Sequence, residues 1–361
     1  MKRLPVLVRV LRDPSVVRDL DDAGWDLLLR QADVANLDAL LLVRLEDAGL
    51  LDTVPAAPRT HLEWTRVGAT SHARAARYEV RQIGRALADL GLPLILLKGA
   101  AYAMADLDAG RGRLFSDIDI LVPKARLPEV EAALMMHGWI TTHHDAYDQR
   151  YYRQWMHELP PMQHARRGNS IDVHHAILPE TAPVRPDPDS LRAHARPIDG
   201  MPGLAVLAPH DMVLHSAVHL FFDGEFDKGL RDLFDLHRLL EQFGAEPGFW
   251  EGLPARARAL ELGRPLFYAL RYCRLLLGTT VPRDVLDAVA QDGPNPVLCK
   301  LMDSLFERAL LPQHASCDTP ASTAARFLLY VRGNWLRMPP LLLARHLFHK
   351  AFLTPRTESA P

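Results

Sequence analysis

The stretch Arg113-Leu114-Phe115-Ser116-Asp117-Ile118-Asp119-Ile120-Leu121-Val122 decides how this chain is interpreted, because it sets two carboxylates two residues apart in a strongly apolar strand. Side chains alternate in direction along a strand, so Asp117 and Asp119 share one face while Ile118 and Ile120 point into a core. Adjacent carboxylates repel, and a buried charge needs a partner. The stretch therefore predicts a strand that offers paired ligands to a divalent metal ion.

The composition is that of an ordinary globular protein. The chain has 361 residues, 48% of them apolar, and 42 lysines and arginines against 44 acidic residues. This length allows two domains, and the charge balance gives no global sign of nucleic-acid binding. The three cysteines, Cys273, Cys299 and Cys317, lack metal-ligand spacing and favour a reducing, cytoplasmic setting. We expect neither an export signal nor a membrane span, because no apolar run is long enough.

Before the carboxylate strand, the chain predicts helices and then one short strand. Apolar spacing between Asp19 and Leu50 indicates two helices broken near Asn36, and a long helix follows to about residue 90. Residues 94–97 are typical of a short buried strand. Lys98-Gly99-Ala100 is then expected to turn into another helix.

After the carboxylate strand, a helix should begin near Leu127 and end at Gly138, followed by a strand at 139–142. Residues 159–174 predict a hairpin that returns to the same sheet, with Asp172 in mid-strand. The proline-rich stretch 181–209 indicates a linker. Helical periodicity continues to about residue 353.

These patterns together predict an α+β protein. The expected parts are an N-terminal helical portion (1–90), a catalytic core with a small mixed sheet (91–180), the linker (181–209), a mainly helical C-terminal domain (210–353) and a tail (354–361). Three carboxylates on neighbouring strands, Asp117, Asp119 and Asp172, can hold two magnesium ions, a known arrangement for in-line displacement at phosphorus.

The motifs resemble the DNA polymerase β-like nucleotidyltransferase superfamily. More narrowly, Leu97-Lys98-Gly99-Ala100, the stretch Ser116 to Val122 and Ile171-Asp172-Val173-His174 resemble an uncharacterised bacterial nucleotidyltransferase family in which lysine-glycine replaces glycine-serine. The segment 207–240 is also similar to that family's helical half. The resemblance implies a polymerase β-like core, Mg²⁺ or Mn²⁺, and transfer of a nucleotidyl group from an NTP to a small-molecule, protein or RNA acceptor.

Residue by residue, the resemblance implies that Asp117 and Asp119 bind metal and that Asp172 is a third ligand or the general base. Gly99 would let the backbone approach the phosphates. The resemblance also implies further candidate contacts to the triphosphate or its metal ions, namely Lys98, Arg111, Arg113, Ser116 and His174.

Other interpretations stay open at this point. Lys98 and Arg113 could instead form surface salt bridges, and the helix with Arg231 and Asp235 could be a solvated face or close over the sheet. His215 and His219 stand four apart but lack the glutamate of a zinc-protease motif. A toxin-like enzyme acting on transfer RNA would need a local basic surface, for which the candidates are Arg150, Arg153, Arg166 and Arg167. A non-catalytic module that binds metal or nucleotide is the alternative from another class.

Overall fold

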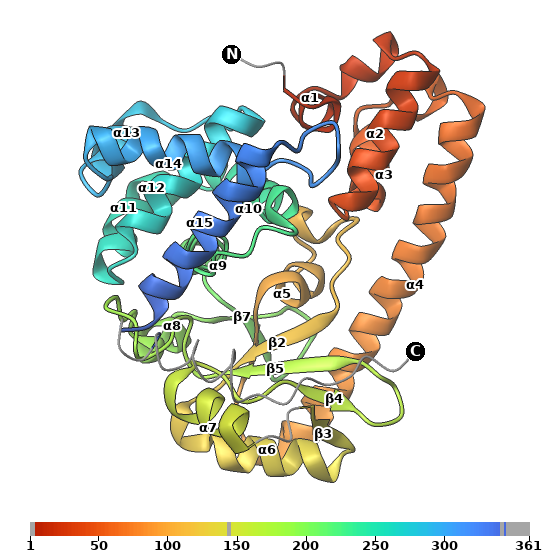
Figure 1. Cartoon of the computed structure of the whole chain (residues 1–361). Coiled ribbons are helices and arrows are strands. Elements are labelled where there is room, and N and C mark those ends of the chain that lie inside the picture. Colours follow the sequence, from red (N-terminus) through yellow and green to blue (C-terminus); the bar gives the residue numbers. More distant parts are fainter. Residues whose placement is uncertain (1–3, 143–145, 340–342, 344–361) are drawn as a thin grey trace.

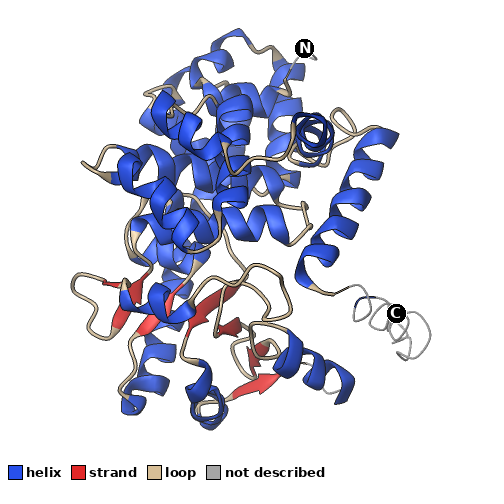
Figure 2. Ribbon diagram, turned by 90° about the vertical axis from the view of Figure 1, so that its left-hand side faces the viewer, coloured by secondary structure: helices blue, strands red, loops and turns tan. Residues whose placement is uncertain are grey.

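The computed structural model describes residues 4–142, 146–339 and 343. Within these residues, helices predominate and pack with one seven-stranded mixed sheet, which lies in the lower part of Figure 1. Figure 2 shows the strands gathered at one end of the molecule and most helices at the other. The chain is therefore a mixed α/β protein, as the sequence predicts.

The N-terminal helices bear out the predicted pattern. Asn36 has a positive φ of 56° and separates two helices at the expected place. The long helix that follows runs beside both the other N-terminal helices and the sheet (Figure 1), and Gly91, with φ 64°, ends the short helical turn that extends it. The elements are α1 (Val6–Arg12), η1 (Pro14–Asp19), α2 (Asp22–Val34), α3 (Asp38–Asp47), η2 (Leu51–Thr53), α4 (Ala56–Leu87) and η3 (Ala88–Leu90).

The sheet has the strand order β3-β4-β5-β2-β1-β7-β6. β1 pairs antiparallel with β2 and parallel with β7, while β2 pairs parallel with β5. β4 and β5 form the predicted hairpin. The strands are β1 (Leu94–Leu96), β2 (Asp117–Leu121), β3 (Trp139–Thr141), β4 (Met162–His164), β5 (Ser170–His174), β6 (Arg196–Pro197) and β7 (Leu204–Val206).

The register of β2 and β5 sets the geometry of the site. Asp119 is paired directly with Asp172, and Ile118 and Ile120 are buried, with 4% and 0% of their surfaces exposed. The alternation inferred from the sequence is therefore confirmed, and the two strands present their carboxylates on one face.

Four helices and two helical turns lie between or beside these strands. Pro128 occupies the first turn of α6, and Gly138, with φ 90°, follows its end, as expected. The elements are α5 (Lys98–Met104), η4 (Asp108–Gly110), η5 (Lys124–Arg126), α6 (Leu127–Met136), α7 (Ala146–Trp155) and α8 (Pro188–Ala193).

The proline-rich stretch 181–209 is not a plain connector. It contains α8 and the strands β6 and β7, and β7 pairs with β1 over Leu204 to Val206. The proline-rich composition predicts a linker, but the prolines lie outside β7 and do not prevent strand pairing. The pairing of β7 with β1 joins residues about a hundred positions apart in the chain, which local composition does not report.

The C-terminal part is helical as predicted, and within the described residues its apolar side chains join the core of the sheet and the N-terminal helices. One cluster of buried apolar residues runs from Val6 through the sheet to Leu329. The elements are α9 (Pro209–Phe222), α10 (Gly229–Gly244), α11 (Phe249–Ala259), α12 (Gly263–Tyr272), the π-helical turn η6 (Cys273–Leu277), α13 (Arg283–Ala290), α14 (Pro296–Ala309) and α15 (Pro320–Arg337). The predicted tail 354–361 and most of the chain after residue 339 lie outside the described residues. None of the helices in the described ranges has the length and apolar character that a bilayer crossing requires.

Candidate active site

Three carboxylates converge where β2 and β5 lie side by side. Each of Asp117, Asp119 and Asp172 offers an oxygen, and the three oxygens lie within 4.8 Å of one another. Oxygen ligands at this spacing suit Mg²⁺ or Mn²⁺. The crowding itself favours a cation, because burial and the neighbouring Asp119 and Glu158 raise the pKa of Asp172 to about 7.

Asp119 is the most buried of the three, with 3% of its surface exposed. Lys98 Nζ donates to its Oδ1 at 2.9 Å, and His174 Nε2 lies 2.9 Å from the same oxygen. Burial alone would raise the pKa of Asp119, but Lys98 and His174 outweigh it and hold that pKa well below its usual value. Both contacts go to Oδ1, so among the residues that the structure describes, none occupies Oδ2, which is the oxygen available to a metal ion.

Lys98 reaches Asp119 from the bend after β1, where α5 begins. Its φ is 47°, in the left-handed region that a residue with a side chain seldom adopts. Burial would lower the pKa of Lys98, but Asp119 raises it, so the ammonium stays charged. A strained backbone here is consistent with a position whose side chain has a functional role.

Gly99 lies against the side chain of Arg113. A methyl group added at Gly99 would overlap the Arg113 guanidinium, which packs directly over it. Arg113 Nε donates to Asp235 Oδ2 at 2.5 Å, and Arg113 Nη2 lies 3.8 Å from Asp232 Oδ1. The glycine therefore makes room for an arginine side chain, and that arginine ties the bend to α10.

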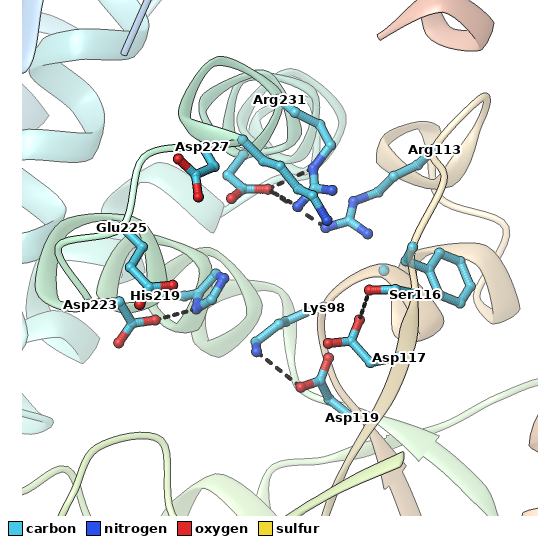
Figure 3. A pocket seen from close by; sticks show the side chains of 14 residues that line it. Lys98, Arg113, Ser116, Asp117, Asp119, His219, Asp223, Glu225, Asp227 and Arg231 are labelled. Atoms are coloured by element: carbon cyan, nitrogen blue, oxygen red, sulfur yellow. Dashed lines mark hydrogen bonds and ion pairs between the residues drawn. The ribbon is translucent and has the colours of Figure 1, made fainter. Parts of the chain in front are cut away.

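A cleft of about 300 Å³ opens beside Asp117 and Asp119 (Figure 3). Its near wall is formed by the bend and β2, and its far wall by the end of α9, the following loop and the start of α10. His219 and Asp223 face the carboxylates across it, their side chains joined at 2.6 Å. The residues around it are Lys98, Gly99, Arg113, Phe115, Ser116, Asp117, Asp119, His219, Asp223, Glu225, Asp227, Lys228, Arg231 and Asp232.

A second cleft, of about 270 Å³, adjoins the first on the Asp172 side. Lys98 lines both clefts, as do His219, Asp223 and Glu225. The remaining residues of the second cleft are Met156, His157, Glu158, Asp172, His174, Ile177, His215 and Arg337. The site thus has two adjoining compartments, with Asp117 and Asp119 in one and Asp172 in the other.

The other predicted residues divide into those at the site and those outside it. Ser116 lines the first cleft, and its Oγ lies 3.3 Å from Asp117 Oδ1. His174 shares a strand face with Asp172 and contacts Asp119. Arg111 lines neither cleft and instead forms an ion pair with Asp47 of α3 at 2.8 Å.

Two arginines of the suggested nucleic-acid surface are engaged within the protein. Arg153 forms an ion pair with Glu131 at 2.6 Å, and Arg167 does the same with the buried Glu79 at 2.6 Å. Both arginines therefore already have carboxylate partners within the protein, and a phosphate would have to compete with them. His215 and His219 belong to neither of the ligand groups found in the described part of the chain.

Two segments contribute side chains to the clefts without having been predicted: the loop between α9 and α10, and the segment before β4. Asp223, Glu225, Asp227 and Lys228 come from the first, and His157 and Glu158 from the second. Four charged residues lie within five positions of Gly224, between α9 and α10. This clustering of charge in a loop is a signal that could have predicted its place at the site. His157 and Glu158 lie in an irregular segment, where periodicity gives no guidance.

The match of a known family to this chain agrees with that geometry. The family described as uncharacterised nucleotidyltransferase matches residues 21–278, well over half of the chain, and the protein belongs to that family. Membership supports nucleotidyl transfer as the general reaction and implies an NTP substrate and a divalent metal ion. No curated protein matches the sequence significantly.

Proposed function

We propose that this protein transfers a nucleoside monophosphate from an NTP to an acceptor hydroxyl or phosphate, on a core of the polymerase β-like kind. The observation that carries the proposal is the pairing of Asp119 with Asp172 on parallel strands, which brings three carboxylates together beside two adjoining clefts. One cleft can take the triphosphate and the other the acceptor.

In this proposal, the NTP lies in the first cleft. Asp117 and Asp119 would hold the divalent metal ions of a two-metal mechanism, and Asp172 lies beside them as the base. When bound, Mg²⁺ or Mn²⁺ supplies charge neutralisation at the phosphates and favours ionisation of the attacking oxygen. Lys228 and Arg231 extend from α10 and its preceding loop into the same cleft and are further candidate phosphate contacts.

The acceptor lies in the second cleft, where Asp172 takes the proton of its hydroxyl. The acceptor oxygen forms a bond to the α-phosphorus, the bond between that phosphorus and the bridging oxygen breaks, and pyrophosphate leaves. Lys98 stands between the clefts and keeps Asp119 ionised. Four carboxylates line this cleft, Glu158, Asp172, Asp223 and Glu225, which favours a small acceptor over a polyanion such as transfer RNA.

Pyrophosphate release from each NTP, with Mg²⁺ or Mn²⁺ and a panel of acceptors, tests the proposal. Asp117→Asn should lower the rate at least about 100-fold, because metal stabilisation supplies several kcal/mol. The matched control is Asp199→Asn, an exposed carboxylate in the turn between β6 and β7. NTP binding without pyrophosphate release, whichever acceptor is present, would favour the non-catalytic module instead. Unchanged pyrophosphate release by Asp117→Asn would refute the assigned site.

A further inference from the structure

Two histidines and a glutamate that the proposed reaction does not use meet in the second cleft. Each of His157, Glu158 and His174 offers one ligand atom, and these atoms lie within 4.8 Å of one another. All three residues line the cleft. Two imidazoles with one carboxylate form a donor set of a different chemical kind from the three aspartates.

The backbone holds this cluster in place. Glu158 forms an antiparallel bridge with His174, and Leu159 N donates to Val173 O at 2.9 Å. His175 N donates to His157 O at 2.8 Å, which fixes His157 relative to β5, the strand that carries His174. The three side chains thus come from two paired segments rather than from a free loop, which keeps the ligand positions rigid.

His157 is suited to bind a cation. His157 lines the second cleft beside His174, with the centres of the two rings 5.3 Å apart. Its Nδ1 is buried and has no hydrogen-bond partner among the described residues. A buried polar nitrogen without a partner costs free energy, and a metal ion would satisfy it.

His174 has the contacts expected of a metal-binding histidine. Its Nε2 lies 2.9 Å from Asp119 Oδ1, and its Nδ1 lies 3.2 Å from Glu158 Oε2. A histidine that binds metal through one nitrogen usually gives its other N–H to a carboxylate, which fixes the ring. Asp119 has that role here, and the Nδ1 side faces Glu158 and the cleft.

We propose that His157, Glu158 and His174 form a second metal site, which binds a divalent transition metal of the zinc class and is distinct from the Mg²⁺ or Mn²⁺ site of the aspartates. Imidazole nitrogens suit Zn²⁺, whereas Mg²⁺ prefers oxygen ligands. Three protein ligands leave a fourth position for water or a ligand from the cleft. This inference does not depend on the proposed reaction.

Zinc binding by the full chain tests the proposal without any measurement of activity. Zn²⁺ is titrated calorimetrically in competition with a chelator, and Co²⁺ is added separately so that its visible spectrum reports nitrogen ligation. We expect one tight site per chain. His157→Gln should weaken it at least about 100-fold, since loss of a direct ligand should exceed the 10–100-fold effect of outer partners.

Two controls separate this site from its neighbours. Asp117→Asn should leave the Zn²⁺ affinity unchanged while it abolishes pyrophosphate release, and His137→Gln, an exposed histidine at the end of α6, should change neither. If His157→Gln does not fold, as judged by circular dichroism, Glu158→Gln gives the same test. Absence of tight Zn²⁺ binding by the wild type would overturn the proposal, as would a site lost in Asp117→Asn but kept in both cluster variants.

Discussion

The ion pair between Arg113 and Asp235 joins the bend after β1 to α10, and its removal should be costly. The side chains of Arg113 and Asp235 are only 6% and 3% exposed, and Nε lies 2.5 Å from Oδ2. Burial would lower the pKa of Arg113, but the two facing aspartates raise it, so the guanidinium stays charged. Asp235→Asn leaves that buried charge with Asp232 alone, 3.8 Å away.

The expected loss can be worked from that geometry. Removal of one partner of a buried ion pair costs about 3–5 kcal/mol, because the other charge stays buried without compensation. Asp232 retains part of the attraction, so Asp235→Asn should lower the free energy of unfolding by about 2–4 kcal/mol. Urea unfolding followed by circular dichroism measures the change. The matched control is Asp26→Asn, which breaks an exposed pair with Arg30 at 2.9 Å and should cost less than about 1 kcal/mol.

A double variant separates stability from substrate binding. Arg113→Met combined with Asp235→Leu removes both charges at similar volume and should restore unfolding free energy to within about 1 kcal/mol of the wild type. If Arg113 also contacts the triphosphate, NTP affinity stays reduced in this variant, whereas a purely structural arginine leaves it unchanged. A cost of Asp235→Asn no larger than that of Asp26→Asn would refute the reasoning.

Two other substitutions test packing and charge. Gly99→Ala should lower the free energy of unfolding by about 1–3 kcal/mol, since the new methyl group overlaps the Arg113 guanidinium. If Gly99→Ala lowers that free energy equally in the Arg113→Met, Asp235→Leu double variant, overlap with the guanidinium is not the cause. Burial raises the pKa of Asp38 to about 6, so the folded state favours the neutral acid. The protonated carboxyl therefore contributes to the free energy of unfolding fully below about pH 4, and this contribution is lost as the pH rises through 6. Asp38→Asn should therefore stabilise the protein by about 1–2 kcal/mol at pH 8, a figure reduced because the carboxyl is partly exposed, and by little at pH 4. Urea unfolding at pH 8 and pH 4 measures the difference. An equal effect at the two pH values would exclude the raised pKa of Asp38 as its cause.

Local pattern was enough to predict the strands that carry the aspartates. The alternation around Ile118 and Ile120 fixes which side chains face the core, and the hairpin returns Asp172 to the same face. The strand β7 escaped prediction because parallel pairing with β1 depends on residues distant in the chain. Periodicity reports the faces of an element, and it does not report which element lies beside it.

The two arginines before β2 illustrate the same limit at the site. Arg111 and Arg113 are equivalent in the sequence, basic residues on either side of a glycine. Arg111 pairs with Asp47, 64 positions away, and Arg113 with Asp235, 122 positions away. Only Arg113 lines the first cleft, so the partners supplied by the N-terminal and C-terminal helices decide which of two similar residues can meet a substrate.

Lys98 connects the proposed reaction to the proposed second metal site. Its ammonium and the His174 ring meet at one oxygen of Asp119, and His174 reaches Glu158 with its other nitrogen. A cation bound by His157, Glu158 and His174 would therefore act on Asp119 through a single ring. Because that ring donates to Oδ1 and leaves Oδ2 unoccupied, occupancy of the histidine site should orient Asp119 for Mg²⁺ without displacing it.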